Sequence, residues 1–279
     1  MGFFKTGDGN DIRPSKLRGQ NFLTDKNIVK KIIAAAELTG DDIVLEVGPG
    51  LGVLTREILP NVKQLNVVEL DPLFVHELRE EFGDKDNIKI IESDILKLKI
   101  SDLVTNYKLI TNLPYNITSA FLKKILTEPS TPERIVIMLQ KEVADRIAGT
   151  NSKPQQPNAK PDGMLGLMCN LYAECSPVCR VAAGCFSPPP KVDSAVICLK
   201  PYSNQAFLDK WGIEREFAED IISFASVFFK EQRKKMCGRL NKERAMACKE
   251  ALIAIGESSD SRPAELSLYK WVELWKKMR

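Results

Sequence analysis

Histidine is nearly missing from this sequence: His76 is the only one among 279 residues. Mechanisms that depend on histidine clusters, such as catalytic triads and most zinc sites, are therefore almost excluded. CxxC pairs are missing too, and the seven cysteines follow no zinc or iron–sulfur spacing. We expect reduced thiols that pack as small apolar residues, and we expect no metal site.

Long apolar runs are also missing. No stretch approaches the roughly 18 apolar residues of a membrane-spanning helix, and the first twenty residues lack the apolar core of a secretory signal. The composition, 44% hydrophobic and 28% charged, is that of an ordinary globular chain. We expect a soluble cytoplasmic protein with no membrane partner, and a monomer because no apolar face is in excess. An organellar source stays open.

The net charge is small, but positive charge is concentrated in one segment. The net charge is only +3, yet residues 230–249 contain eight Lys or Arg against two Glu, a local excess of +6. A solvated helix surface is the ordinary interpretation. A phosphate-binding face is the alternative, and it becomes the better one in the context given below. Its candidate RNA-binding residues are Lys230, Arg233, Lys234, Lys235 and Arg239.

Apolar runs alternate with helical patterns over the first two thirds of the chain. Strands are predicted at 43–47, 65–70, 88–94, 107–111 and 134–140, and helices at 25–37, 53–59, 73–82 and 117–127, the first capped by Thr24 or Asp25. Further strands at 195–200 and near 165–174 would complete the sheet. This order predicts an α/β fold with a parallel sheet covered on both faces.

Strand patterns stop after Pro201, and the remaining residues read as helices. We therefore predict two domains, residues 1–200 with the sheet and residues 201–279 as a small helical domain. The segment 149–163 is rich in Pro, Asn and Lys and lacks periodicity, which is typical of an exposed loop.

A glycine turn follows the first strand of the sheet. In LEVGPGLG (45–52), Gly48, Gly50 and Gly52 allow a tight turn and a close approach of backbone to a ligand at the start of the next helix. Glu69 ends the second strand, 19 residues after Gly50, where an acidic side chain can accept both ribose hydroxyls of a nucleoside. A structural turn and a salt-bridged carboxylate are the ordinary alternatives. Together the features predict a nucleoside cofactor.

The charges near this turn favour one nucleoside cofactor. NAD needs an anion site for its pyrophosphate, whereas Glu46 stands directly before the turn and suits a cationic ligand end such as the ammonium of S-adenosylmethionine. Asp94 closes the third strand, where its carboxylate can accept from an adenine amino group, with the Ile95 amide beside it. Capping a helix is the competing role for Asp94.

The fourth strand ends in NLPY (112–115), a set of acceptors and a ring. The Asn112 side-chain oxygen and the carbonyl of Leu113 or Pro114 can accept from an exocyclic amine, so that its lone pair points at a methyl donor. Tyr115 offers a ring on which a base can stack. Methyl transfer by positioning alone needs no obligatory general base, which suits a chain with one histidine. Asn116 is predicted to cap a helix beginning at Ile117.

Seven motifs in order resemble the ribosomal RNA adenine dimethyltransferases: GQNFL (19–23), EVGPGLG (46–52), ELD (69–71), SD (93–94), NLPY (112–115), LQKEVADR (139–146) and FSPPPKVDSAV (186–196). The resemblance runs from about Lys16 to Leu199 and more weakly through VFFKEQRKKM (227–236). It implies a Rossmann-like class I methyltransferase sheet, mostly parallel with an antiparallel edge strand, and a C-terminal helical RNA-docking domain.

The resemblance also implies an activity and site roles. These enzymes dimethylate two adjacent adenines near the 3′ end of small-subunit rRNA, in a partly assembled subunit, with S-adenosyl-L-methionine as methyl donor. Gln20, Asn21 and Leu23 would close over the cofactor, above Gly48, Glu69, Asp94 and Asn112. Tyr115 and Phe186 would sandwich the flipped adenine. Arg18 and the long 149–163 segment depart from the family pattern.

Two other functions fit parts of the sequence. A large-subunit rRNA adenine methyltransferase of the antibiotic-resistance type would share the cofactor motifs, but FSPPPKVDS and the long helical tail favour the small-subunit enzyme. A non-catalytic nucleic-acid-binding factor could keep the fold, but it would not need Glu69, Asp94 and NLPY together.

Overall fold

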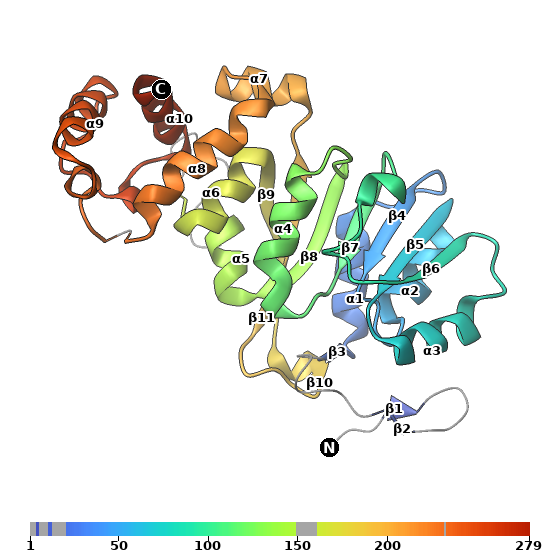
Figure 1. Ribbon diagram of the computed structural model, residues 1–279. Coiled ribbons are helices and arrows are strands. Elements are labelled where there is room, and N and C mark those ends of the chain that lie inside the picture. Colours follow the sequence, from blue (N-terminus) through green and yellow to red (C-terminus); the bar gives the residue numbers. More distant parts are fainter. Residues whose placement is uncertain (1–3, 6–10, 13–20, 149–160, 232) are drawn as a thin grey trace. The chain divides into compact units, whose positions relative to one another are not determined.

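The β-branched apolar runs of the sequence form the core of an α/β fold in the computed structural model (Figure 1). The structure describes residues 4–5, 11–12, 21–148, 161–231 and 233–279. Seven strands form one sheet in the order β6-β5-β4-β7-β8-β11-β9. Their bounds are β4 Ile43–Val47, β5 Gln64–Glu69, β6 Ile88–Glu92, β7 Lys108–Thr111, β8 Arg134–Gln140, β9 Ala173–Val181 and β11 Ser194–Pro201.

The pairing confirms the predicted fold class. β6, β5, β4, β7 and β8 are parallel to their neighbours, whereas β11 pairs antiparallel with β8. The inner parallel strands β4, β5, β7 and β8 are buried along most of their length, which is why their sequences are largely apolar. Short ladders join β1 (Phe4–Lys5) to β2 (Asp11–Ile12) and β3 (Phe22–Leu23) to β10 (Phe186–Ser187).

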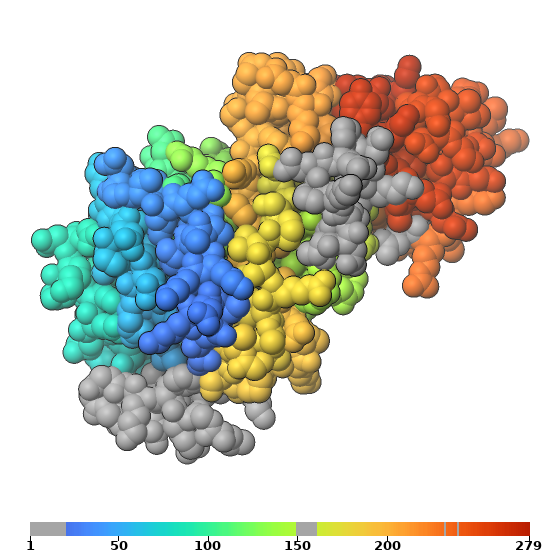
Figure 2. Space-filling model, turned by 180° about the vertical axis from the view of Figure 1, so that it is seen from behind, coloured from blue at the N-terminus to red at the C-terminus, as the bar shows by residue number. Residues whose placement is uncertain are grey.

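Helices cover the sheet on both faces. They are α1 Lys26–Ala36, α2 Val53–Ile58, α3 Pro72–Phe82, α4 Thr118–Thr127 and α5 Lys141–Ala148. α4 lies in front of the sheet in Figure 1, whereas α1 (blue) faces the viewer in the reverse view of Figure 2. Asp25 caps α1, since its carboxylate accepts from the N–H groups of Asn27 (2.8 Å) and Ile28 (3.3 Å).

The prediction of a strand near 165–174 is wrong. Gly163–Tyr172 is a helix, α6, and the strand β9 follows it directly at Ala173. Leu167, Met168, Leu171 and Tyr172 are all buried. A helix buried on most sides reads as a continuous apolar run, which periodicity cannot distinguish from a buried strand.

The predicted cap at Asn116 is also wrong. A 3₁₀ helix, η4 (Tyr115–Ile117), precedes α4, which begins at Thr118 without a side-chain cap. Asn116 therefore lies inside a helical turn, whereas an N-cap residue must have extended backbone.

The chain forms two compact units. Unit 1 comprises Met1–Ala144 and Ser176–Pro201, and unit 2 comprises Asp145–Cys175 and Tyr202–Arg279. The last change of unit, after Pro201, falls beside the predicted boundary, but Asp145–Cys175 groups with the C-terminal helices. Backbone and side-chain bonds explain this: Tyr202 N–H donates to Tyr172 O (2.9 Å) and Trp211 Nε1 donates to Leu171 O (3.0 Å).

Unit 2 is helical, as the sequence of its C-terminal part predicts. Besides α6 it contains α7 (Asn204–Trp211), α8 (Ala218–Phe229), α9 (Lys242–Ala254) and α10 (Leu268–Met278). Phe224, Phe228 and Phe229 of α8 pack on Trp271 of α10, with ring centroids 5.4–6.2 Å apart. No helix in the described parts of either unit is both long and apolar enough to cross a membrane.

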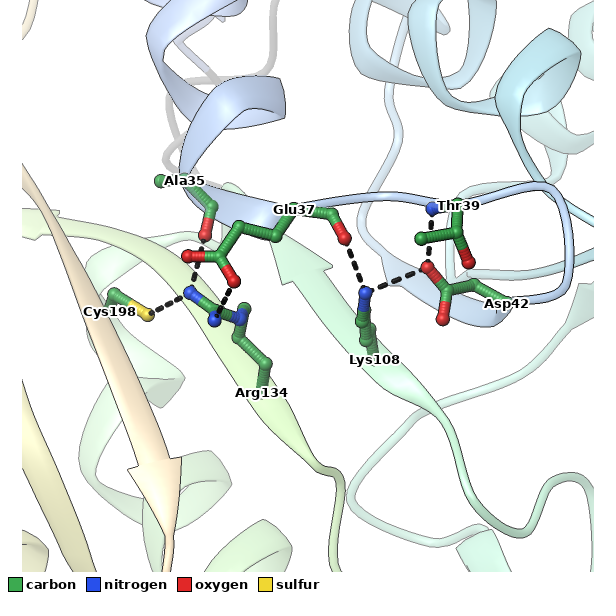
Figure 3. A network of polar contacts seen from close by, with 7 residues as sticks. All are labelled: Ala35, Glu37, Thr39, Asp42, Lys108, Arg134 and Cys198. Atoms are coloured by element: carbon green, nitrogen blue, oxygen red, sulfur yellow. Dashed lines mark hydrogen bonds and ion pairs between the residues drawn. The ribbon is translucent and has the colours of Figure 1, made fainter.

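Ion pairs fasten the amino-terminal edge of the sheet (Figure 3). Lys108, the first residue of β7, donates to Asp42 Oδ2 (2.7 Å), and Asp42 Oδ2 also accepts from Thr39 N–H (2.6 Å). Arg134, the first residue of β8, donates to Ala35 O (3.0 Å) and pairs with Glu37. The end of α1 is thereby fixed to the starts of three neighbouring strands.

Candidate active site

The glycine turn after β4 has the backbone that its sequence predicts. Gly48, Gly50 and Gly52 all have positive φ (68°, 55° and 71°), a conformation that side chains disfavour. A Cβ on Gly48 would stand 3.2 Å from Leu113 Cδ2, and one on Gly50 would stand 3.1 Å from the Phe22 ring. Glycine therefore lets the turn approach both the NLPY segment and β3.

Glu69 is held at the end of β5 by backbone donors. Its Oε1 accepts from the N–H groups of Leu70 (2.8 Å) and Asp71 (2.9 Å), and its Oε2 accepts from Gly50 N–H (3.2 Å). Burial nevertheless raises the pKa of this carboxyl, because the side chain is only 8% exposed. The bonds fix the carboxylate beside the glycine turn and leave Oε2 lone pairs for a ligand hydroxyl.

Glu46 does not lie where the sequence predicts it, beside the cationic end of a ligand. Its side chain does not line the cavity; it is buried, and its Oε2 accepts from Thr55 Oγ1 (2.7 Å). Burial, together with the nearby Glu69, raises the pKa of Glu46 to about 8. Its Oε1 has no hydrogen-bond partner within the described part of the chain. Contact of Glu46 with a ligand ammonium, as the sequence predicts, is therefore not what the geometry offers.

The carboxyl ends of the central strands bring the other predicted residues to one cavity of about 490 Å³ within unit 1. Parallel strands that neighbour one another end at the same edge of the sheet, so residues distant in sequence converge there. Thr111 Oγ1 donates to Val47 O (2.7 Å) and ties β7 to β4 at this edge. The predicted residues that line the cavity are Asn21, Leu23, Gly48, Gly50, Glu69, Asp94, Ile95, Asn112, Leu113, Pro114, Tyr115 and Phe186. Gln20 lies outside the described residues.

The cavity is acidic and partly apolar. Its charged lining side chains are Glu69, Asp71 and Asp94, and the described residues that line it include no Lys or Arg. Asp94 Oδ1 accepts from Leu96 N–H (3.0 Å), which orients the carboxylate. Phosphate groups would meet only like charge here, whereas a cation would be stabilised. A nucleoside with a positive charge therefore fits these acceptors better than a dinucleotide does.

Two aromatic residues of the cavity wall were not predicted as site residues. Phe22 of β3 and Phe74 of α3 form an edge-to-face pair with centroids 5.4 Å apart, and Leu51 packs against both. Phe74 lies one turn after Asp71, which caps α3 by accepting from Leu73 N–H (3.2 Å). An apolar residue in the first turn after the acidic strand end is the signal that could have indicated it.

β3 and β10 connect the wall near Asn21 to Phe186. Leu23 pairs with Phe186 and Phe22 with Ser187, while Thr24 N–H and Oγ1 both donate to Cys185 O (2.9 and 3.0 Å). Segments about 160 positions apart therefore lie side by side, as the adjoining blue and yellow surfaces of Figure 2 show. Phe186 is 4% exposed and lines the cavity.

Tyr115 also lines the cavity, at the start of η4. Its hydroxyl is 2.6 Å from Ser194 Oγ, and either oxygen can donate. Burial raises the pKa of Tyr115, so the hydroxyl is neutral at physiological pH. His76, in contrast, is exposed on α3 and does not line the cavity.

The predicted RNA-binding residues lie in unit 2. Lys230, Arg233, Lys234 and Lys235 are exposed, and the backbone of Arg239 belongs to η7 (Met236–Arg239). Arg233, Lys234 and Lys235 line a hollow of about 370 Å³ together with Gly238 and Arg262. Arg262 comes from a distant segment, which the local charge count could not reveal.

The sheet order, the glycine turn and the acidic strand ends define a class I methyltransferase fold, and solved structures agree. The 23S rRNA methyltransferase ErmE matches with a TM-score of 0.71 at 27% identity, over 92% of this chain and 99% of that one. A dimethyladenosine transferase from Plasmodium falciparum matches with a TM-score of 0.73 at 23% identity, over 91% and 95%, and supports the fold.

Sequence comparison identifies the family within this class of methyltransferases. The model of the ribosomal RNA adenine dimethylase family matches residues 13–213. The ribosomal RNA small subunit methyltransferase A of Thermosynechococcus vestitus is 36% identical over 274 residues, which cover 96% of this chain and 98% of that protein. The chain belongs to the ribosomal RNA adenine dimethylase family, so the resemblance predicted from its motifs is confirmed.

Proposed function

We propose that this protein dimethylates the exocyclic amino groups of two adjacent adenosines near the 3′ end of small-subunit rRNA. The observation that carries the proposal is the acidic cavity in which NLPY faces the glycine turn, with a Cβ at Gly48 coming within 3.9 Å of Asn112 O. The relative from Thermosynechococcus vestitus is named as a small-subunit methyltransferase, and it matches this chain over nearly its full length. This similarity supports the choice of substrate.

The cavity suits S-adenosyl-L-methionine as the methyl donor. Glu69 would accept the ribose hydroxyls, while Asp94 and the Ile95 N–H would recognise the adenine edge. Phe22, Phe74 and Leu51 supply an apolar wall for the base, and Asn21 and Leu23 border the same cavity. When bound, this cofactor supplies an electrophilic methyl group on a positively charged sulfur, which the acidic lining stabilises.

NLPY would hold the target amine. The side-chain oxygen of Asn112 and the carbonyl of Leu113 or Pro114 accept its two hydrogens, so that the nitrogen lone pair faces the methyl group. Pro114 has extended backbone (φ −55°, ψ 136°) and no N–H, which leaves acceptors rather than donors at this position. Tyr115 and Phe186 would stack on the flipped base. The newly methylated nitrogen releases a proton, which water can accept, so the step requires no histidine.

An assay on ribosomal subunits tests the activity. Purified protein with labelled S-adenosylmethionine should methylate small subunits that lack the modification, at two adjacent adenosines near the 3′ end. Labelling confined to large-subunit RNA would favour the activity that the name of ErmE describes, and no labelling would favour a non-catalytic RNA-binding factor. Either result would overturn the proposal.

The exposed cations of unit 2 would dock the RNA. Lys234 and Lys235 pair with exposed acids, Glu231 (2.9 Å) and Asp260 (2.6 Å), and such surface pairs exchange readily for phosphate contacts. Replacing Arg233, Lys234 and Lys235 by Gln should weaken RNA binding. The slope of log K against log salt should fall by about 0.7–0.9 for each phosphate that the variant no longer binds. Replacing Lys26, Lys30 and Lys31 of α1 is a control of equal charge, and an equal loss there would contradict a specific docking face.

A further inference from the structure

Two hydroxyl groups meet at the cavity wall, in a pairing that neither motif predicts. Tyr115 Oη lies 2.6 Å from Ser194 Oγ, across 79 positions of sequence. Ser194 is fully buried as the first residue of β11, and Tyr115 is half-buried against the cavity. The tyrosine hydroxyl is therefore used within the protein, and its ring is the part that faces a ligand.

The local backbone structure does little to fix the orientation of the Tyr115 ring. Tyr115 opens a 3₁₀ helix of three residues directly after Pro114, which has no N–H to donate. Short 3₁₀ turns have poor hydrogen-bond geometry. A bond at the far end of the side chain fixes the axis from Cβ to Oη, after which only rotation about that axis is left to packing. Ser194 thus supplies the orientation that the turn does not.

Ser194 itself is firmly held. It pairs with Gln140 of β8, and the preceding Asp193 accepts Lys141 N–H through its carbonyl (2.9 Å) and Ala183 N–H through Oδ1 (3.0 Å). Ala183 opens η5 (Ala183–Cys185), which leads directly into Phe186. Asp193 and Ser194 therefore anchor both aromatic walls of the base site, one through η5 and the other through Tyr115 Oη.

We infer that Ser194 is a positioning residue for the target base, because its hydroxyl holds the Tyr115 ring on which the adenine stacks. The inference rests on the proposed function and adds to it a residue that touches neither the cofactor nor the base. Methyl transfer depends on alignment, so loosening the ring should slow the chemical step more than it weakens RNA docking.

Removing either hydroxyl tests this hydrogen bond while keeping the ring. Ser194→Ala and Tyr115→Phe each delete one partner, and the double variant deletes both. Tyr107→Phe is a matched control, because Tyr107 stands before the other end of β7 and its hydroxyl donates to Ser130 O (3.1 Å), away from the cavity lining. For each variant we would measure kcat and KM with undermethylated small subunits, and the stoichiometry and Kd of S-adenosylmethionine by calorimetry.

Both single variants should lose about tenfold in kcat, with KM and the cofactor Kd within about twofold of wild type. The double variant should be no slower than the slower single variant, because each substitution removes the same bond. Tyr107→Phe should keep the wild-type kcat.

Wild-type kcat in either single variant, or losses that multiply in the double variant, would overturn the inference. An equal loss in Tyr107→Phe would also overturn it, since that would indicate general destabilisation. Should Ser194→Ala bind the cofactor substoichiometrically, Tyr115→Phe decides alone. A wild-type protein that methylates no small subunit would instead overturn the proposed function, and the inference with it.

Discussion

Charged side chains have opposite roles at the two ends of the central strands, which are called here the amino-terminal and the carboxyl-terminal edge of the sheet. At the amino-terminal edge, Lys108 and Arg134 each meet an acid and a backbone carbonyl (Figure 3). At the carboxyl-terminal edge, Glu69, Asp71 and Asp94 line a cavity whose described lining includes no Lys or Arg. The first arrangement stabilises the fold. The second costs stability and creates a negative field for a ligand, so changes at the two edges should have separable effects.

The largest effect is expected for Asn112→Ala, at the carboxyl edge. If the Asn112 oxygen directs the amine, its loss should lower kcat by about 10²–10³-fold, the range seen when one positioned transition-state interaction is removed. The cofactor Kd should rise only a few-fold, and the melting temperature should stay near wild type. Rate assays on small subunits with calorimetry for the cofactor measure both. Unchanged turnover would refute the role given to Asn112.

Glu69→Gln should act on cofactor binding. The amide keeps the shape but loses the charge that would accept both ribose hydroxyls, so the Kd for S-adenosylmethionine should rise about 10–100-fold. Stability should stay near that of wild type, because removing a buried charge that is costly in the fold offsets the backbone N–H bond that the amide nitrogen cannot accept. Calorimetry and thermal unfolding of the ligand-free protein check the two halves. A marked fall in stability would mean that the carboxylate is structural.

Lys108→Met should do the reverse at the amino edge. Burial tends to raise the pKa of Asp42, but the bonds from Lys108 and Thr39 N–H hold it below its ordinary value of 3.8. Without Lys108 this carboxylate, which is 16% exposed, loses its ion pair, and we expect about 1–3 kcal/mol less free energy of unfolding. Denaturant titration measures it. At a temperature where the variant is folded, kcat should equal that of wild type; a lowered kcat would show that the edges are coupled.

The smallest effect is expected for Glu46→Gln, and it should appear as pH dependence. The pKa of about 8 lies above the ordinary value of 4.5, so between these pH values the native state holds a proton that the unfolded chain has lost. The stabilising contribution of protonated Glu46 should therefore be fully present below pH 4.5 and should be lost as the pH rises through 8. Gln cannot titrate, so its free energy of unfolding should decline less than that of wild type between pH 5 and pH 8 in unfolding experiments. Parallel curves for the two proteins would contradict the raised pKa.

Local patterns predicted most of the sheet. The strands at 43–47 and 134–140 have the predicted bounds, because buried parallel strands are apolar throughout and end at glycine or polar residues. The same rule failed at 165–174, where a buried helix has an equally apolar sequence. The prediction that Asn116 caps α4 was wrong because a 3₁₀ turn precedes this helix, and such short turns are hard to recognise in a sequence.

The residues of the candidate site also fall into two groups, those that local sequence predicts and those that it does not. Its glycines and acids could be named from spacing, since a turn with positive φ and an acidic strand end each depend on a few neighbouring residues. Ser194 and Phe22 could not, because each acts through a partner from a distant segment. Glu46 shows the limit most clearly, since its neighbours in sequence suggested a ligand and its burial assigns it to Thr55.

Sequence by itself determined the α/β class, the membership in the rRNA adenine dimethylase family, and the identity of most residues that line the cavity. These properties depend on local backbone preferences and on the rule that parallel strands end at one edge. Only the tertiary structure decided which polar atoms pair with the protein and which face the cavity. Burial and pairing are set by residues tens of positions apart, so Tyr115 meets Ser194, and Lys108 meets Asp42, for reasons that no local pattern contains.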